Sequence, residues 1–272
     1  MTPIFDHAPK PAEDPDKRGR KPGSSLLASR FRRDGYHIVR GLVSPARCRA
    51  LRQAVTRALE PLQGPAEFEA DIGYPGAPSA RGALGGDTPR RLLHAYSRDP
   101  VFRRWAVSTS VRDWLRELTG ATNVWLSQCH HNCAMTKFPG FSSRTDWHQD
   151  VRYWSFDRPE LVSVWLALGP ERAANGALLV LPGSHRLDLD RGRLDQHLFL
   201  RTELEENRSL IATASELELE PGDVLFFHCR LFHAAGKNET DAVKLSLVHT
   251  YHFEDNRPIP GTRSAQYPSV RL

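Results

Sequence analysis

The feature of this sequence that most constrains its fold is a His-x-Asp pair, His148 and Asp150, with His233 far downstream. Two histidines and one carboxylate form the facial triad that holds Fe(II) and leaves coordination positions open. Residues i and i+2 of a β-strand face the same side, so one strand can present both His148 and Asp150 to a metal. The third ligand must come from another strand that folding brings alongside. The pattern therefore predicts a sheet-rich fold in which two distant segments meet.

Two histidines compete for the third position. His228 ends the apolar segment that begins at Val224, and His233 follows five residues later. By spacing alone, either histidine can complete the triad.

Short apolar segments alternate with turn sequences from residue 123 onward. Pro139-Gly140, Pro182-Gly183 and Pro221-Gly222-Asp223 are typical turn signals. Many short strands separated in this way indicate a mainly β protein, and the double-stranded β-helix (jelly roll, cupin-like) is the architecture that suits such a metal site. We expect strands over 124–136, 161–168, 177–182, 215–220, 224–228 and 243–253.

The N-terminal part carries helical signals instead. Ser44-Pro45 places a capping residue before a proline at the first helical position, and Cys48, Leu51 and Val55 recur at helical spacing. We expect α-helices that flank one sheet over 26–34, 44–60 and 110–119.

Length and composition favour one large domain. The 272 residues are 40% hydrophobic, and we predict a flexible polar arm over 1–24 and a single domain over 25–272. Within it, 61–100 is rich in glycine, proline and arginine with little periodicity, which indicates a substrate lid loop. No apolar run is long enough to span a membrane, and the four cysteines suit a reducing compartment, so we expect the cytoplasm.

Three ordered sequence blocks resemble the phytanoyl-CoA dioxygenase family. They are Asp146–Tyr153, the Asn175–Leu178 segment that runs on into Leu181–His185, and Pro221–His228 with His233 beyond. The opening segment Phe31–Leu42 is also similar to that family. The resemblance implies an Fe(II)- and 2-oxoglutarate-dependent dioxygenase that uses O₂ and releases succinate and CO₂. It assigns the metal to His148, Asp150 and His233, and therefore favours His233 over His228.

The sequence departs from the family where the far carboxylate of 2-oxoglutarate binds. The family usually has an arginine at the position of Lys244, and a small hydroxyl at the position of Ala235. We expect Lys244 to supply the cation, with Ser246 or Thr250 replacing the missing hydroxyl. Arg263 is an alternative cation.

Other residues align with the walls of the family's co-substrate pocket. Gln149 and Trp165 are expected there, although Trp165 also fits plain core packing, and Cys133 shares a strand face with the site. Lys137 matches a family lysine and fits either an edge charge or a substrate-side cation. The Cys129–Cys133 segment does not favour zinc, because no second cysteine pair completes a site.

The net charge of +5 mildly favours a small anionic substrate. Arg152 follows Asp150 by two residues, and three roles are open: it meets that substrate together with an arginine of 61–100, it braces Asp150, or it points to solvent if the strand ends at Asp150. Two other functions remain open: a non-catalytic metal- or ligand-binding jelly roll, and a nucleic-acid demethylase on the same fold. No stripe of basic and aromatic residues supports nucleic-acid binding.

Overall fold

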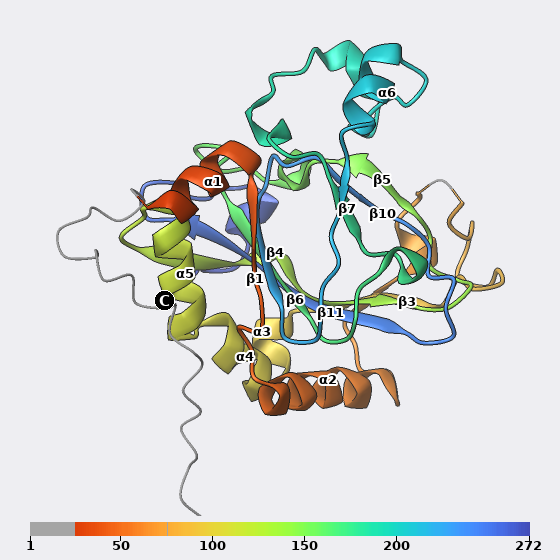
Figure 1. Cartoon of the computed structure of the whole chain (residues 1–272). Coiled ribbons are helices and arrows are strands. Elements are labelled where there is room, and N and C mark those ends of the chain that lie inside the picture. Colours follow the sequence, from red (N-terminus) through yellow and green to blue (C-terminus); the bar gives the residue numbers. More distant parts are fainter. Residues whose placement is uncertain (1–24, 75) are drawn as a thin grey trace, which may run out of the picture.

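Two antiparallel sheets face each other, and helices cover the outer face of the larger one (Figure 1). The structure is a computed structural model that describes residues 25–74 and 76–272. The polar arm expected over 1–24 lies outside the described residues. The arrangement is a jelly roll with flanking N-terminal helices, as the sequence predicts.

The larger sheet has the strand order β1-β9-β6-β11-β4-β3-β2, and β12 also pairs with β4. The smaller sheet has the order β5-β10-β7-β8. The larger sheet contains β1 (Tyr36–Val39), β2 (Ala66–Phe68), β3 (Pro89–Leu93), β4 (Val124–Lys137), β6 (Val162–Ala167), β9 (Val224–His228), β11 (Lys244–Phe253) and β12 (Val270–Arg271). The smaller sheet contains β5 (Thr145–His148), β7 (Leu178–Val180), β8 (Ser215–Glu216) and β10 (His233–Ala235).

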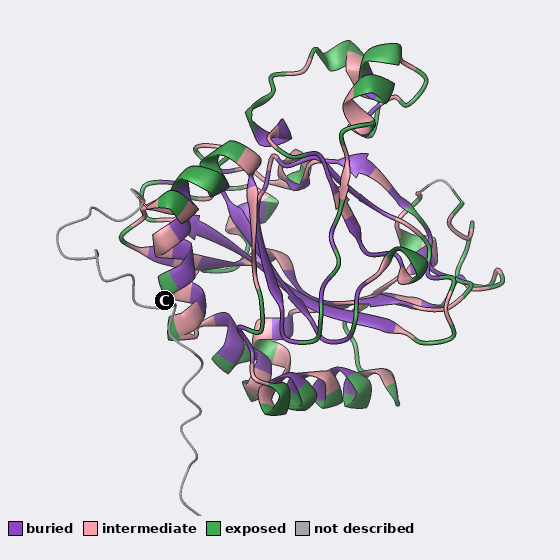
Figure 2. Cartoon of the chain, in the orientation of Figure 1, coloured by how far each residue is buried: buried purple, intermediate pink, exposed green. Residues whose placement is uncertain are grey.

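Strand β6 shows how the larger sheet divides the interior. Alternate residues of a strand face opposite sides. Val164 and Leu166 join the core beneath the helices, whereas Trp165 and Ala167 join the core between the two sheets. All six residues of β6 are buried (Figure 2). The larger sheet is therefore covered on both faces, by the helices on one and by the smaller sheet on the other.

The helices begin where the sequence supplies capping side chains. The Ser44 hydroxyl accepts a hydrogen bond from the backbone N–H of Arg47 at the start of α2, and the Ser108 hydroxyl accepts one from the backbone N–H of Val111 at the start of α5. The α-helices are α1 (Leu26–Asp34), α2 (Pro45–Leu59), α3 (Ala95–Arg98), α4 (Pro100–Ala106), α5 (Thr109–Thr119) and α6 (Glu205–Ile211). Short 3₁₀ helices are η1 (Glu69–Asp71), η2 (Asp150–Tyr153), η3 (Ala173–Asn175), η4 (Ser184–Arg186), η5 (Arg191–Arg193) and η6 (Arg263–Ala265).

The expected helices and long strands are all present, but the segment 61–100 is more regular than its composition indicated. It contains β2, η1, β3 and α3, and β3 pairs with β4 in the larger sheet. Pairing with a long strand elsewhere in the chain supplies the hydrogen bonds that local sequence does not reveal. Among the described residues, no helix is long and apolar enough to cross a membrane.

Hydrogen bonds connect the Pro221-Gly222-Asp223 turn, which precedes β9, to the residues that follow β1. The Asp223 carboxylate accepts hydrogen bonds from the Gly41 N–H at 2.8 Å and from Arg40 Nη1 at 2.7 Å. Gly222 has φ +95°, and a Cβ there would lie 2.4 Å from the carbonyl oxygen of Val43. Only glycine fits this position without movement of the backbone.

We expect Gly222→Ala to lower the free energy of unfolding by roughly 2–4 kcal/mol, because a positive φ and a backbone clash act together. Gly261→Ala is the matched control, since Gly261 has φ +79° but open space around its Cβ position, and it should lose only about 1–2 kcal/mol. Denaturant unfolding measures both variants. Equal losses would show that the clash with Val43 contributes nothing.

Candidate active site

The three residues of the candidate triad meet where β5 and β10 pair. His233 lies directly opposite His148 in this antiparallel pair, and the centroids of their rings are 4.2 Å apart. Asp150 Oδ1 lies 3.8 Å from His148 Nε2 and 3.6 Å from His233 Nε2. All three side chains are buried, and within the described part of the chain they form the one group of histidine, cysteine and acidic residues arranged to hold a metal.

Asp150 reaches the site by a different route from the one predicted. Strand β5 ends at His148, and Asp150 is the first residue of the 3₁₀ helix η2. The expectation that one strand presents both side chains is therefore wrong, although the two side chains do converge. A turn brings the carboxylate back toward the histidine after the strand has ended.

The hydrogen bonds of the two histidines fix which nitrogen faces the centre. His148 Nδ1 donates to the carbonyl oxygen of Asp146 at 2.8 Å, and His233 Nδ1 donates to that of Leu231 at 3.0 Å. With the proton on Nδ1, each Nε2 lone pair is left for a metal. Burial lowers the pKa of both imidazoles, which favours the neutral form that binds metals.

The Asp150 carboxylate is held in its charged form. Burial acts to raise its pKa, but the neighbouring histidines, of which His131 has the largest effect, outweigh burial and keep that pKa below the ordinary value. Its Oδ2 accepts a hydrogen bond from Ser163 Oγ at 3.2 Å and lies 3.4 Å from His131 Nδ1. A metal ion at the Nε2 atoms would therefore meet a fixed anion.

His228, the rival third ligand, is directed elsewhere. Its Nδ1 accepts a hydrogen bond from the Arg230 N–H at 3.1 Å, and its ring packs against His185 with centroids 5.1 Å apart. The structure thus brings His233, and not His228, to Asp150.

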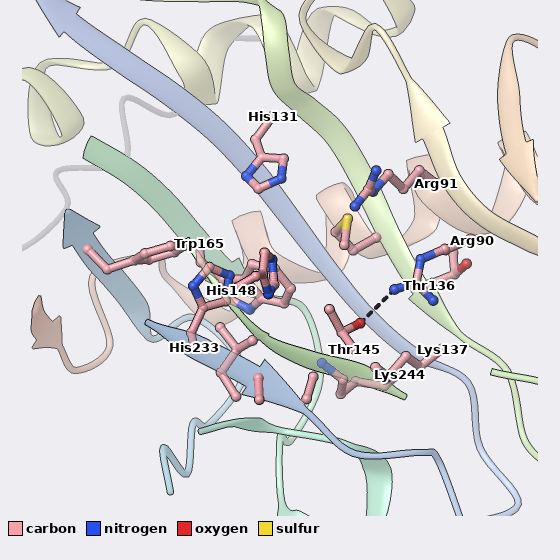
Figure 3. A pocket seen from close by; sticks show the side chains of 15 residues that line it. Arg90, Arg91, His131, Thr136, Lys137, Thr145, His148, Trp165, His233 and Lys244 are labelled. Carbon is pink, nitrogen blue, oxygen red and sulfur yellow. Dashed lines mark hydrogen bonds between the residues drawn. The ribbon is translucent and has the colours of Figure 1, made fainter. Parts of the chain in front are cut away.

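A pocket between the two sheets opens from the histidines toward a group of cations (Figure 3). We call it the inner pocket. Figure 3 shows Lys137 and Lys244 together on one side of it. Its wall includes His148, His233, Trp165, Thr145, Arg90, Arg91, Lys137 and Lys244.

Lys244 has a partner that the sequence did not suggest. Its Nζ lies 3.1 Å from Oε2 of the buried Glu171. Oε1 of the same carboxylate accepts hydrogen bonds from Ser246 Oγ at 2.6 Å and from Trp165 Nε1 at 2.8 Å. Three residues expected around the co-substrate therefore converge on one acidic side chain. Glu171 follows the turn-forming sequence Gly169-Pro170 and pairs with Leu219 in an isolated β-bridge. A glutamate after such a sequence is usually exposed, so nothing in the sequence indicated its role.

Lys137 lies beside Lys244, because the two residues are directly paired across β4 and β11. Its ammonium group donates to the carbonyl oxygens of Ser143, at 3.2 Å, and Gly236. No carboxylate among the described residues lies within ion-pair distance of it. Burial, with Lys244 nearby, holds the pKa of Lys137 well below its usual value. Lys137 is therefore a buried amine whose charged form has no carboxylate to stabilise it within the described part of the chain.

Two arginines of 61–100 belong to the same wall. Arg90 is buried, pairs with Glu69 at 3.2 Å and donates to Thr145 Oγ1 at 2.7 Å. Arg91 pairs with Glu67 at 2.9 Å. The sequence shows the excess of arginine in this segment. It does not show that Glu69 and Glu67 pair with these two arginines.

A second hollow, the outer pocket, meets the inner pocket at His148, His131 and Arg91. Its wall combines part of 61–100 with aromatic and polar residues from elsewhere. This wall includes Glu67, Asp71, Tyr74, Cys133, Asp150, Tyr153, Trp154 and Arg263.

The remaining predicted residues lie around this outer pocket or beside the triad. Cys133 is a buried wall residue, and burial raises its pKa to about 12. Arg263 is exposed at the pocket, and the Gln149 amide donates to the carbonyl oxygen of Arg230 at 2.5 Å. Arg152 donates to the carbonyl oxygen of His197 at 2.7 Å and lies 4.0 Å above the ring of Phe199.

Comparison with known proteins identifies the family. The profile of the phytanoyl-CoA dioxygenase (PhyH) family matches residues 31–246. A probable phytanoyl-CoA dioxygenase from Caenorhabditis elegans is 27% identical over 60% of this chain and 54% of its own length. The ectoine dioxygenase of Sphingopyxis alaskensis is 26% identical over 87% of this chain and 78% of its own length.

Solved structures show the same fold. The apo structure of EctD from S. alaskensis superposes with a TM-score of 0.70 at 22% identity, covering 91% of this chain and 83% of that one. The α-ketoglutarate-dependent epimerase SnoN from nogalamycin biosynthesis has a TM-score of 0.69 at 22% identity, covering 86% and 84%.

The chain belongs to the phytanoyl-CoA dioxygenase family. The predicted resemblance, the jelly-roll fold and the class of Fe(II)- and 2-oxoglutarate-dependent dioxygenases are thereby confirmed.

We expect His233→Ala to abolish stoichiometric Fe(II) binding and His228→Ala to preserve it, because His233 faces Asp150 and His228 does not. Anaerobic equilibrium dialysis with Fe(II), followed by metal analysis, measures both variants, and circular dichroism confirms that each is folded. Loss of iron from folded His228→Ala with retention in His233→Ala would reverse the assignment.

Proposed function

We propose that this protein binds Fe(II) through His148, Asp150 and His233 and hydroxylates a small anionic organic molecule with 2-oxoglutarate and O₂. The observation that carries the proposal is the buried triad, with two Nε2 atoms and one carboxylate oxygen turned to one point. Family membership supplies the reaction class. Bound iron and co-substrate would supply the oxidising chemistry, with succinate and CO₂ as products.

The residues of the two pockets have separable tasks in this proposal. The inner pocket receives 2-oxoglutarate, whose far carboxylate points toward Lys244 and Lys137. Trp165 and the strands around it exclude water from that side. The outer pocket receives the substrate on the other side of His148. Asp150 keeps its charge and the two histidines keep their neutral form, so the donor set is ready before a metal arrives.

The presence of a carboxylate at position 150 favours hydroxylation. In related enzymes that halogenate, chloride takes the place of this ligand. Here Asp150 is present and braced by Ser163. An intact, buried donor set also disfavours a purely non-catalytic jelly roll. A nucleic-acid substrate gains no support from the site, because the wall of the outer pocket carries Glu67, Asp71 and Asp150 and is not a basic stripe.

The charges around the outer pocket support an anionic substrate. Glu67 is paired with Arg91, and Asp71 is paired with Arg81 at 2.6 Å. In the described part of the chain, no carboxylate pairs with Arg152 or Arg263. Arg152 is half-buried and donates to the hydroxyl of Tyr74, which lines the pocket. These two arginines are therefore the cations left to meet a substrate carboxylate or phosphate.

The part of 61–100 that lines the outer pocket suits a lid. It contributes Glu67, Asp71 and Tyr74, and Arg81 holds Asp71 in place from within the same segment. Closure over bound substrate would exclude water from the reacting atoms. The four free, buried cysteines also fit the reducing cytoplasm that we propose for this enzyme.

We expect the Fe(II)-loaded protein to convert 2-oxoglutarate to succinate, and His148→Ala to lose this activity entirely. The assay measures succinate release, and incubation with metabolite extracts identifies the substrate by a gain of one oxygen in mass. A folded, iron-loaded protein that releases no succinate with any extract would contradict the proposed reaction.

We expect Arg152→Gln to raise the KM for the true substrate by about 10-fold or more, because one charge-assisted hydrogen bond is worth roughly 1.5–3 kcal/mol. The affinity for the co-substrate 2-oxoglutarate should change little. Arg158→Gln is a matched control, since that arginine pairs with Asp255 on the surface. A neutral true substrate, or equal loss of both affinities, would exclude this role for Arg152.

A further inference from the structure

An acidic side chain lies behind the wall of the inner pocket, in contact with the wall residues Lys244 and Trp165. Glu171 is 1% exposed, and its Oε2 lies 3.1 Å from Lys244 Nζ. The lysine thus already has a carboxylate before 2-oxoglutarate, a dianion, enters. A second carboxylate brought to the same ammonium group is opposed by the first, because like charges within a few ångströms destabilise each other.

The other charges of the wall show how little positive charge remains. Arg90 is paired with Glu69, Arg91 with Glu67, and Lys244 with Glu171. Lys137 alone in this set donates only to carbonyl oxygens. Of these four basic side chains, only Lys137 has no carboxylate partner among the described residues. Without Glu171, Lys244 would also lack one, and the two lysines are neighbours on β4 and β11.

Glu171 is also held firmly in place. Trp165 Nε1 and Ser246 Oγ both donate to its Oε1. These two donors keep the carboxylate against Lys244 and resist its withdrawal when another anion arrives. The Glu171 carboxylate is thus held in place as the counterion of Lys244.

We propose that Glu171 is a specificity-determining residue that acts through Lys244: it competes with the far carboxylate of 2-oxoglutarate and so weakens co-substrate binding. The inference rests on the proposed function, in which the far carboxylate points toward Lys244 and Lys137. Glu171 sets how strongly the pocket prefers a dicarboxylate over a 2-oxo acid without a far charge.

The test is an anaerobic titration of the Fe(II)-loaded protein with two 2-oxo acids. An Fe(II)–2-oxo acid chelate absorbs visible light, so binding is measured without turnover. The ligands are 2-oxoglutarate and 2-oxopentanoate, which has the same carbon chain but no far carboxylate. We expect Glu171→Gln to tighten 2-oxoglutarate binding by about tenfold or more, the size of a one-unit shift between neighbouring charges. Binding of 2-oxopentanoate should change by less than about threefold, which is under 1 kcal/mol.

Two further variants separate the proposed role from general effects. Glu220→Gln removes a surface carboxylate that pairs with Arg172, and it should leave both affinities unchanged. In a Lys244→Met background, Glu171→Gln should have little effect on 2-oxoglutarate, because the group through which Glu171 acts is gone. If Glu171→Gln does not fold, Glu171→Asp draws the carboxylate back from Lys244 and should shift the affinity in the same direction.

Weaker or unchanged 2-oxoglutarate binding in folded Glu171→Gln would overturn the inference and show that Glu171 only keeps Lys244 in place. A full-sized effect in the Lys244→Met background would also overturn it. If the wild-type protein forms no chelate with either acid, the proposed function itself fails, which is a distinct result.

Discussion

The direct pairing of His233 with His148 across β10 and β5 is the constraint on which the site depends. A shift of one residue in this register would turn one of the two rings to the opposite face of the sheet. The hydrogen bonds from each Nδ1 to a backbone carbonyl then orient both rings toward Asp150. The core between the two sheets packs on one face of these strands, and a second cluster that includes Trp147, Leu181 and Phe232 packs on the other face.

The cluster of buried ion pairs is the second organising feature of the site. Removing charged groups from water is costly, and a buried pair often contributes little net stability. Arg90 with Glu69 and Lys244 with Glu171 are therefore poor candidates for stabilising elements alone. The basic members of these pairs line one pocket together with Lys137, which has no carboxylate partner among the described residues. This arrangement points instead to a role in recognising an anion.

The sequence predicted what depends on local pattern. Hydrophobic periodicity located α2 and the long strands β4, β6 and β11, and the motif around His148 indicated the metal centre. It could not predict short strands such as β10, whose three residues take their form from pairing with β5 and β7. It also missed Glu171, because only the fold turns that side chain inward. In β4, the partners on β11 jump from Asn132 to Ser127, so 128–131 leave the ladder and carry His131 to Asp150. Periodicity gives no sign of such an insertion.

The small sheet has a consequence for how the protein behaves when iron is scarce. Its strands are only two to four residues long, and two of the three candidate ligands lie on the facing strands β5 and β10. A metal bound there would act as a cross-link between them. A ligand that binds only the folded state stabilises it by about 2.7 kcal/mol when its free concentration is 100 times its Kd. Iron supply would then govern the lifetime of the folded enzyme in the cell as well as its turnover. Protein without bound metal would unfold more often and would be degraded by proteases first.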